Sequence, residues 1–207
     1  MKRTILFTAL LLALAPLTRA GEATPTFSGA TQSRDWFDGG AFELELMSGL
    51  VGGSLEGSHT SHHYTDTELR LGWMVYSPRG PGIFRGNIEI MAALGGGGIY
   101  EGPGSVYGTA GGILRYNFIQ PSARLVPYFQ IGAAAFASDM ARDPKQLDIG
   151  GTFEADLNSG GGLKFLVSRH WSVNAEIFFE HVSNANTQPR NVGINALGGL
   201  LGISRSF

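Results

Sequence analysis

The sequence repeats one pattern along most of its length, in which apolar and polar residues alternate with a period of two. This alternation places successive side chains on opposite faces of a β-strand. Helical spacing of apolar residues is not found after the N-terminal region. The alternating segments number eight and span 42–46, 68–76, 84–94, 106–118, 125–135, 153–165, 173–180 and 193–207. We therefore expect an all-β chain with an even number of strands.

The polar faces of these strands carry full charges of both signs. Such a pattern fits a soluble antiparallel sheet or lipocalin-like barrel with its apolar face inward, or a membrane barrel with its apolar face outward. In a membrane barrel of eight strands, the interior is filled by side chains. The residues expected to line that interior are Glu43, Glu45, Arg70, Arg85, Glu89, Arg115, Glu154, Asp156, Lys164, Glu176 and Glu180.

The lengths of the links between strands favour the membrane barrel. Short links ("SPRGPG", "IQPSAR", "SRH") alternate with longer ones ("GGSLEGSHTSHHYTD", "GGGGIYEGPG", "SDMARDPKQLD", "NANTQPRNV"). Outer-membrane barrels alternate short periplasmic turns with long outer loops in this way. The sequence ends on Phe207, which resembles the C-terminal signal of such barrels, although Arg205 occupies a position that is usually apolar. We predict an eight-stranded antiparallel transmembrane β-barrel of the outer membrane over residues 40–207.

The N-terminus has the features of an export signal. Lys2 and Arg3 precede an apolar run that is too short to span a membrane as a helix, and small residues follow. Residues 1–20 are expected to form a cleaved signal peptide, with the boundary between 20 and 23. Residues 21–39 then form an N-terminal segment before the barrel. This organisation directs the chain to the outer membrane of a Gram-negative cell.

Composition narrows the chemistry that is available. The sequence contains no cysteine, which rules out disulfides and thiolate metal sites, and its net charge of −2 gives no reason to expect nucleic acid as a partner. We expect no metal and no cofactor. His59, His62 and His63 are interpreted as exposed histidines of the first long loop, and Gly95–Gly98 as part of a flexible outer loop.

The stretch "FFEHVSNANTQPRNVGIN" ends an apolar strand with two reactive side chains. His181 and Ser183 continue the face of Val173 and Ile177, which points to lipid in a membrane barrel. The strand from Asn195 to the C-terminus spans roughly 30 Å along the barrel axis, at about 3.4 Å per residue and about 40° of tilt. His181, Ser183 and Asn195 are therefore expected to cluster at the outer-leaflet interface.

These residue types suit ester cleavage. An imidazole can remove the proton of a serine hydroxyl near neutral pH, and a third group can orient the imidazole. Asn184 and nearby backbone N–H groups are candidates for stabilising the oxyanion. The spacing His-x-Ser is also compatible with two interfacial polar residues at a strand end, without catalysis.

The stretch "HVSNANTQPRNVGIN" resembles the PagL-type lipid A 3-O-deacylases of the acyloxyacyl hydrolase superfamily. "SGGGLKF" and "PYFQIGAAAF" extend the resemblance over about the last 80 residues of the chain. The resemblance implies that Ser183 is the nucleophile and His181 the general base. It also implies that the substrate is lipid A, the part of lipopolysaccharide that lies among the outer-membrane lipids. Asn195 stands where the family pattern has an acidic orienting residue. An amide can accept the imidazole N–H but provides no negative charge.

Three hypotheses follow for function. The first is a lipid A deacylase that removes an ester-linked acyl chain, at the 3-position, by a Ser/His mechanism. The second is a non-enzymatic small outer-membrane barrel, of the adhesin or membrane-stability type, or a catalytically impaired family member. The third is a soluble lipocalin-like carrier. The sequence leaves open whether the protein forms a homodimer and which acyl chain it would remove.

Overall fold

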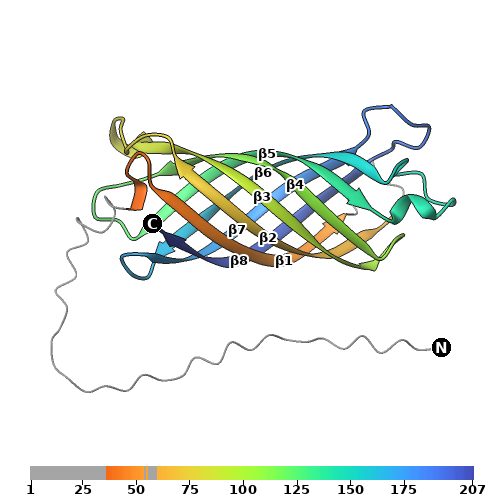
Figure 1. The fold of residues 1–207 in the computed structure, drawn as a ribbon, viewed down its shortest axis with the longest axis horizontal. Coiled ribbons are helices and arrows are strands. Elements are labelled where there is room, and N and C mark those ends of the chain that lie inside the picture. Colours follow the sequence, from red (N-terminus) through yellow and green to blue (C-terminus); the bar gives the residue numbers. More distant parts are fainter. Residues whose placement is uncertain (1–35, 54, 56–59) are drawn as a thin grey trace, which may run out of the picture.

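The computed structural model describes residues 36–53, 55 and 60–207, and these residues form one β-barrel (Figure 1). The predicted signal peptide and most of the predicted segment 21–39 lie outside the described residues. The strands are β1 (Phe42–Gly53), β2 (His62–Met74), β3 (Gly86–Glu101), β4 (Val106–Phe118), β5 (Leu125–Ser138), β6 (Phe153–Leu166), β7 (Trp171–Ser183) and β8 (Ile194–Ser206). Two short 3₁₀ turns, η1 (Gly82–Phe84) and η2 (Met140–Arg142), lie between strands. The prediction of an all-β fold is confirmed.

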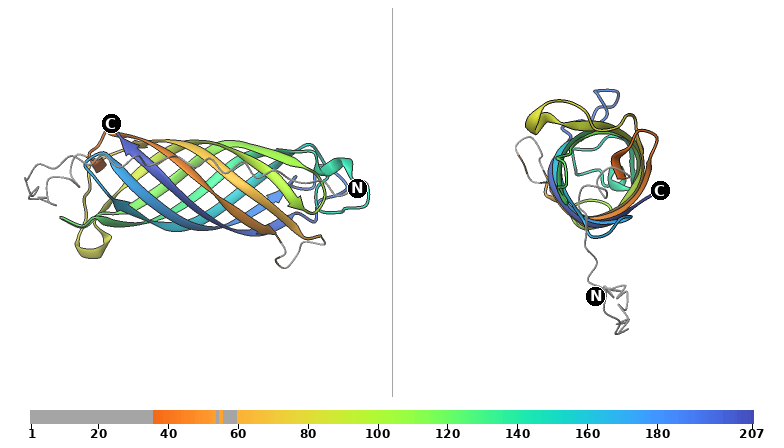
Figure 2. Two further views of the ribbon diagram at one scale, coloured as in Figure 1. Left: turned by 90° about the horizontal axis from the view of Figure 1, so that it is seen from below. Right: turned by 90° about the vertical axis from the view of Figure 1, so that its left-hand side faces the viewer.

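Each strand pairs antiparallel with its neighbours in sequence, and β1 pairs with β8 to close the barrel (Figure 2). Glu43 and Glu45 of β1 are buried inside, whereas Leu44 and Leu46 face outward. The apolar face of each strand is therefore the outer one, as in a barrel surrounded by lipid. No helix in the described part of the chain is long and apolar enough to cross a membrane.

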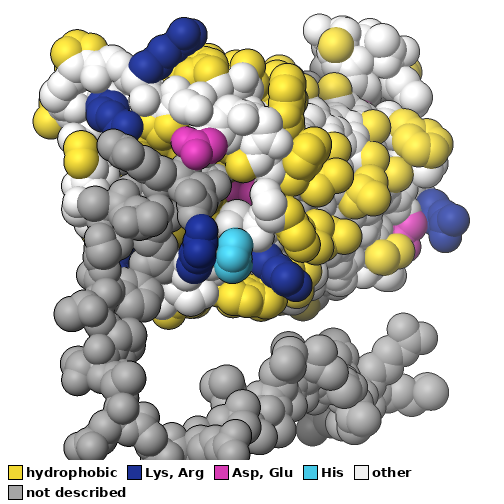
Figure 3. Space-filling model, turned by 60° about the vertical axis from the view of Figure 1, so that its left-hand side comes forward, with side chains coloured by type: hydrophobic (Ala, Val, Ile, Leu, Met, Phe, Trp, Pro, Cys, Tyr) yellow, Lys and Arg dark blue, Asp and Glu magenta, His cyan; other side chains and the backbone are white. Residues whose placement is uncertain are grey.

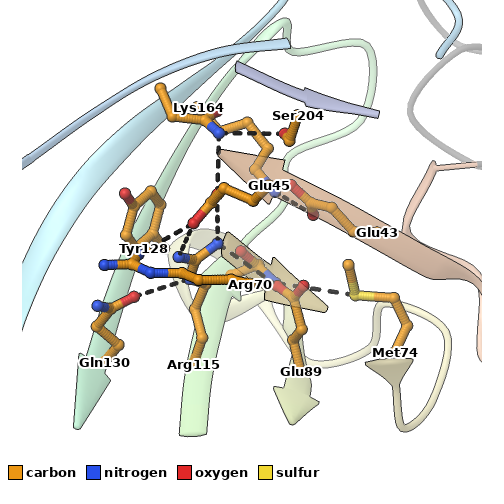
Figure 4. A network of polar contacts seen from close by, with 12 residues as sticks. Glu43, Glu45, Arg70, Met74, Glu89, Arg115, Tyr128, Gln130, Lys164 and Ser204 are labelled. Carbon is orange, nitrogen blue, oxygen red and sulfur yellow. Dashed lines mark hydrogen bonds and ion pairs between the residues drawn. The ribbon is translucent and has the colours of Figure 1, made fainter. Parts of the chain in front are cut away.

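Charged side chains fill the middle of the barrel (Figure 4). Glu45 accepts hydrogen bonds from Arg70 and Arg115 at 3.0 and 2.8 Å, and Arg70 also pairs with Glu176 at 2.9 Å. Lys164 pairs with Glu43. A buried charge is stable only when it is paired and hydrogen-bonded. These contacts join β1, β2, β4, β6 and β7 through the interior.

Two apolar clusters lie on either side of this ionic network. The cluster at the end where the chain terminates contains Trp36, Phe37, Met74, Ile119, Val126 and Leu166. Trp36 and Phe37 come from the segment before β1 and are fully buried in this cluster, and Figure 2 (right) shows that segment inside the ring of strands. The opposite cluster contains Met47, Val51, Tyr64, Tyr107, Phe136, Met140, Ile149, Phe178, Val182, Ile194, Ala196 and Leu200.

The links at the two ends define the orientation. The end near the C-terminus carries residues 75–85, 119–124 and 167–170, and the other end carries 102–105, 139–152 and 184–193, together with the described residues between β1 and β2. Outer-membrane barrels have short periplasmic turns and longer outer loops, so the end with the short links 119–124 and 167–170 is the periplasmic one. The predicted alternation of link lengths is wrong at two places. The link 102–105 is short because β3 continues to Glu101, and the link 75–85 is long because β2 ends at Met74 and β3 begins only at Gly86.

Gly95–Gly98 belong to β3 and not to a flexible outer loop, which corrects the prediction. They pair with residues 106–109 of β4. A Cβ atom at Gly97 would lie 1.8 Å from the carbonyl oxygen of Thr65, so the neighbouring strand approaches too closely for a side chain. A run of glycine carries no alternation of polarity, and for this reason the strand was not recognisable.

Two further predictions are corrected. His62 and His63 lie in β2 rather than in a loop, and His62 is fully buried against Asp148; His59 lies outside the described residues. Arg85 does not line the interior. It follows η1, before β3 begins, and donates a hydrogen bond to the carbonyl of Ile119 at 2.7 Å.

Candidate active site

The pairing of β7 with β8 places His181 directly opposite Asn195. Nδ1 of His181 lies 2.8 Å from Oδ1 of Asn195, and both side chains are half-buried on the lipid-facing surface near the outer end. An amide oxygen can only accept, so Nδ1 carries the proton and donates it. The other ring nitrogen, Nε2, then has a lone pair with which it can accept a proton.

Ser183 is the last residue of β7 and lies on the same face as His181. No hydrogen bond connects its hydroxyl to the imidazole in the described structure. Catalytic hydrogen bonds are often long or poorly aligned before substrate binds, so this spacing does not exclude proton transfer. Ser183 and His181 therefore lie on the same face of β7, and the contact between their side chains is not formed in the described structure.

Gly193 determines the space between these two side chains. A Cβ atom on Gly193 would lie 3.1 Å from Cε1 of His181 and 3.6 Å from Cβ of Ser183, so the imidazole and the serine border the same small volume. Gly193 also has φ +84°, a backbone conformation that favours glycine. The sequence motif includes this glycine but indicates no role for it; its packing becomes visible only in three dimensions.

Asn184 lies on the opposite side of the chain from the pair. Its Nδ2 donates to the carbonyl of Arg190 at 2.9 Å and lies 3.5 Å from Glu154, and its backbone N–H donates to Asn191 at 2.7 Å. In this arrangement Asn184 holds the loop 184–193 in shape. Its role as an oxyanion donor stays a prediction, because the loop would have to release one of these donors.

The loop that leads into β8 is fixed by the neighbouring outer loop 139–152. The backbone N–H of Gly193 donates to the carbonyl of Asp148 at 3.0 Å, and the Asp148 side chain lies 2.9 Å from Nε2 of His62. Arg190 adds hydrogen bonds to the carbonyls of Ala141 and Asp143, each at 2.8 Å. The start of β8, and with it Asn195, is therefore anchored to β2 through buried polar contacts that the sequence did not reveal.

A shallow apolar groove begins beside the site on the lipid-facing surface. Leu157 of β6 pairs with His181 on one side and with Ala133 of β5 on the other. Leu157 and Ala133 border a groove of about 590 Å³ that continues over β3, β4 and β5. A second groove of about 560 Å³ lies over β6, β7 and β8 and contains Ala175. Among the residues that the structure describes, no three His, Asp or Glu side chains are arranged to bind a metal ion.

The family model described as lipid A 3-O-deacylase (PagL) matches residues 31–204. The chain belongs to the lipid A 3-O-deacylase (PagL) family. It is thus placed among outer-membrane β-barrel proteins that deacylate lipid A. A comparison with curated protein sequences gives no match.

Solved structures with the same fold are also outer-membrane barrels. The outer-membrane enzyme PagL is 19% identical, covers 76% of this chain and 97% of its own, and has a TM-score of 0.53. Neisserial surface protein A is 15% identical over 81% of this chain and 99% of its own, with a TM-score of 0.58. The N-terminal barrel domain of OprF from Pseudomonas aeruginosa is 15% identical over 82% and 98%, with a TM-score of 0.54. At these identities the likeness concerns the fold, and localisation in the outer membrane agrees with it.

Proposed function

We propose that this member of the PagL family hydrolyses the ester-linked acyl chain at the 3-position of lipid A, with Ser183 as nucleophile. The observation that supports the proposal most directly is the hydrogen bond from His181 to Asn195 on the lipid-facing surface. It fixes the tautomer that a general base requires. The pair lies near the outer end of β7 and β8, and the proposal assigns this depth to the outer leaflet, where the ester bonds of lipid A lie.

The reaction would proceed in two steps. Oγ of Ser183 attacks the carbonyl carbon of the ester while Nε2 of His181 takes the hydroxyl proton. The tetrahedral intermediate collapses, the bond to the sugar oxygen breaks, and the imidazolium returns its proton to that oxygen. Water, deprotonated by His181, then attacks the acyl-serine. This second step releases the fatty acid and regenerates the serine hydroxyl.

Asn195 sets the expected rate. Its carbonyl orients the imidazole but cannot stabilise the imidazolium that forms when His181 accepts a proton. Replacing the carboxylate of a serine-protease triad by its amide lowers kcat about 10⁴-fold. We therefore expect a slow deacylase, and an inactive barrel is the limiting case of the same reasoning. Asn184 is retained as the proposed oxyanion donor, acting once the loop 184–193 adjusts to substrate.

The groove beside His181 is suited to the acyl chain that is cleaved. It is lined by apolar side chains, including Ile90, Leu114, Ile131 and Leu157. Its upper end lies next to the imidazole through the pairing of Leu157 with His181. A chain lying in this groove would keep its apolar contacts with the bilayer and present its ester to Ser183. This arrangement needs no removal of the lipid from the membrane.

Mass spectrometry of lipid A tests the proposal. Wild type, Ser183→Ala, His181→Ala and Ser159→Ala are expressed in a Gram-negative host whose lipid A keeps its 3-O-acyl chain. Ser159 is the matched control because it is a serine on the lipid-facing side of β6, opposite Phe179. We expect loss of one 3-O-acyl chain with wild type and Ser159→Ala, and an unmodified profile with the other two variants.

Folding is checked on the same membranes by the shift in gel mobility between heated and unheated samples. Identical lipid A profiles for wild type and Ser183→Ala, with both proteins folded in the outer membrane, would rule out the enzymatic proposal. Tandem fragmentation of the product assigns the position of the lost chain. Loss of an acyl chain from another position would retain the mechanism and reject the 3-position.

A further inference from the structure

The periplasmic end of the barrel carries a concentration of positive charge. The basic side chains in the links and strand ends there are Arg79, Arg85, Arg124, Arg169, His170 and Arg205. Asp38 is the one acidic side chain exposed at this end among the described residues. Figure 3 shows this end turned toward the viewer, with Lys and Arg side chains next to the yellow apolar surface. We call the six basic residues the periplasmic collar.

Arg205 lies where the collar meets the membrane-facing surface. It is an exposed residue on the lipid-facing side of β8, and it pairs with Trp171 of β7. Its guanidinium carbon lies 4.9 Å from the ring centre of Phe207 and 5.7 Å from that of Trp171. Trp and Tyr rings mark the boundary between hydrocarbon and headgroups, and long basic side chains extend from there toward the headgroups. Arg205 is therefore held at headgroup depth.

Arg79 repeats this arrangement in the link between β2 and β3, and Arg85 lies in the same link. The guanidinium carbon of Arg79 lies 4.0 Å from the ring centre of Tyr76. Arg85 donates one hydrogen bond to the carbonyl of Ile119 and has further donors left over. Within the described residues, Arg79, Arg85 and Arg205 form no ion pair with a carboxylate. In this part of the chain their charges are therefore not neutralised by the protein.

The outer end of the barrel has no such excess among the described residues. Its arginine and lysine side chains are the exposed Arg142 and Lys145 and the half-buried Arg190, and the loop 139–152 that holds the first two also contains Asp139 and Asp143. Glu101 adds another exposed carboxylate at the end of β3. The two ends therefore differ in charge, although both lie at a membrane surface.

We propose that the periplasmic collar binds the headgroups of anionic phospholipids in the periplasmic leaflet. The guanidinium fork matches phosphate oxygens and retains its charge at any physiological pH. The aromatic rings beneath Arg79 and Arg205 hold these forks at the depth of the phosphates. Each basic residue close to an anionic leaflet strengthens binding roughly fivefold. This site is distinct from the candidate active site, which faces the other leaflet.

Lipid retention in nanodiscs tests the proposal. The full-length protein is reconstituted in equal parts of phosphatidylglycerol and phosphatidylcholine, extracted in mild detergent, and analysed for co-purified lipid by native mass spectrometry. The variants are Arg79→Gln with Arg205→Gln, and as matched control Arg142→Gln with Lys145→Gln at the outer end. Gel mobility confirms that each variant is folded.

We expect enrichment of phosphatidylglycerol with wild type and with the outer-end control. In the Arg79→Gln/Arg205→Gln variant the enrichment should be lower by roughly tenfold or more. The difference in enrichment between wild type and this variant should shrink as the salt concentration is raised. Equal retention of the two lipids by wild type, or equal losses in both double variants, would overturn the proposal. Lipid retention and its salt dependence are measured without ester hydrolysis. The result therefore does not depend on the proposed function.

Discussion

His181 and Asn195 face each other across the β7–β8 pair, with 2.8 Å between Nδ1 and Oδ1. This contact holds the imidazole in one orientation, but it provides no carboxylate for the imidazolium that forms when His181 accepts a proton. A carboxylate at the same place would keep the hydrogen bond and stabilise the imidazolium.

Asn195→Glu is therefore expected to raise the initial rate of fatty-acid release at least tenfold. Asn195→Leu, which removes the acceptor and keeps the branched shape of the side chain, should lower the rate by a similar factor. The rates are measured on lipopolysaccharide in detergent micelles. A faster Asn195→Leu would show that the hydrogen bond does not serve the reaction.

Gly193 supplies a second prediction. Alanine at this position would be strained at φ +84° and would press against Cε1 of His181. We expect Gly193→Ala to reduce the deacylation rate at least tenfold while the barrel remains folded by gel mobility. Gly199→Ala is the control, because its Cβ would meet nothing nearer than 3.9 Å. Equal activity of both variants would contradict the assignment of Gly193.

The groove beside the site predicts chain-length selectivity. Ala133→Phe would fill the groove that begins at Leu157, whereas Ala175→Phe would fill the separate groove over β6, β7 and β8. Ala133→Phe is expected to slow cleavage of long-chain esters several-fold more than that of a short-chain ester. Ala175→Phe should leave the ratio of the two cleavage rates unchanged. This ratio is measured with a long-chain and a short-chain ester present together in the same micelles.

The buried contact between His62 and Asp148 predicts an effect on loop order. His62→Phe would remove the imidazole that lies 2.9 Å from the buried Asp148 carboxylate, and losing one partner of a buried hydrogen bond costs about 1–3 kcal/mol. The loop 139–152 should then open more often, and trypsin should cleave it faster after Arg142 or Lys145. Adding Asp148→Leu should restore resistance, because it removes the buried carboxylate that has lost its imidazole partner.

His63→Gln, at the neighbouring half-exposed position, is the control for this experiment. If His62→Phe and His63→Gln are cleaved at the same rate, the contact does not hold the loop. Asn195 lies beyond Gly193 on the same anchored segment. Deacylation by His62→Phe is therefore expected to fall together with its resistance to trypsin.

Period-two alternation was sufficient to predict most of the barrel and the direction of its site. The alternation indicated that the side chains of His181 and Ser183 point outward. The antiparallel order of the strands placed Asn195 on the neighbouring strand. These features depend on local geometry, which repeats every second residue regardless of distant contacts. For this reason the amino-acid sequence alone indicates which side chains of β7 face lipid.

Features that depend on close approach between distant segments were not predictable. The strand at Gly95–Gly98 has no side chains to alternate, and its extended shape follows from contact with Thr65. His62 looked like a loop histidine because the residue that buries it, Asp148, is far away in sequence. The packing of Gly193 against His181 likewise arises only when β7 and the start of β8 come together.

The apolar clusters at the two ends of the barrel have a consequence for membrane permeability. The ionic network between them borders a cavity of only about 30 Å³, which can hold little more than a water molecule or two. An ion would have to displace packed aromatic side chains at both ends to pass. The protein should therefore be electrically silent in a planar bilayer, and the cell gains a lipid-facing surface without a leak through it.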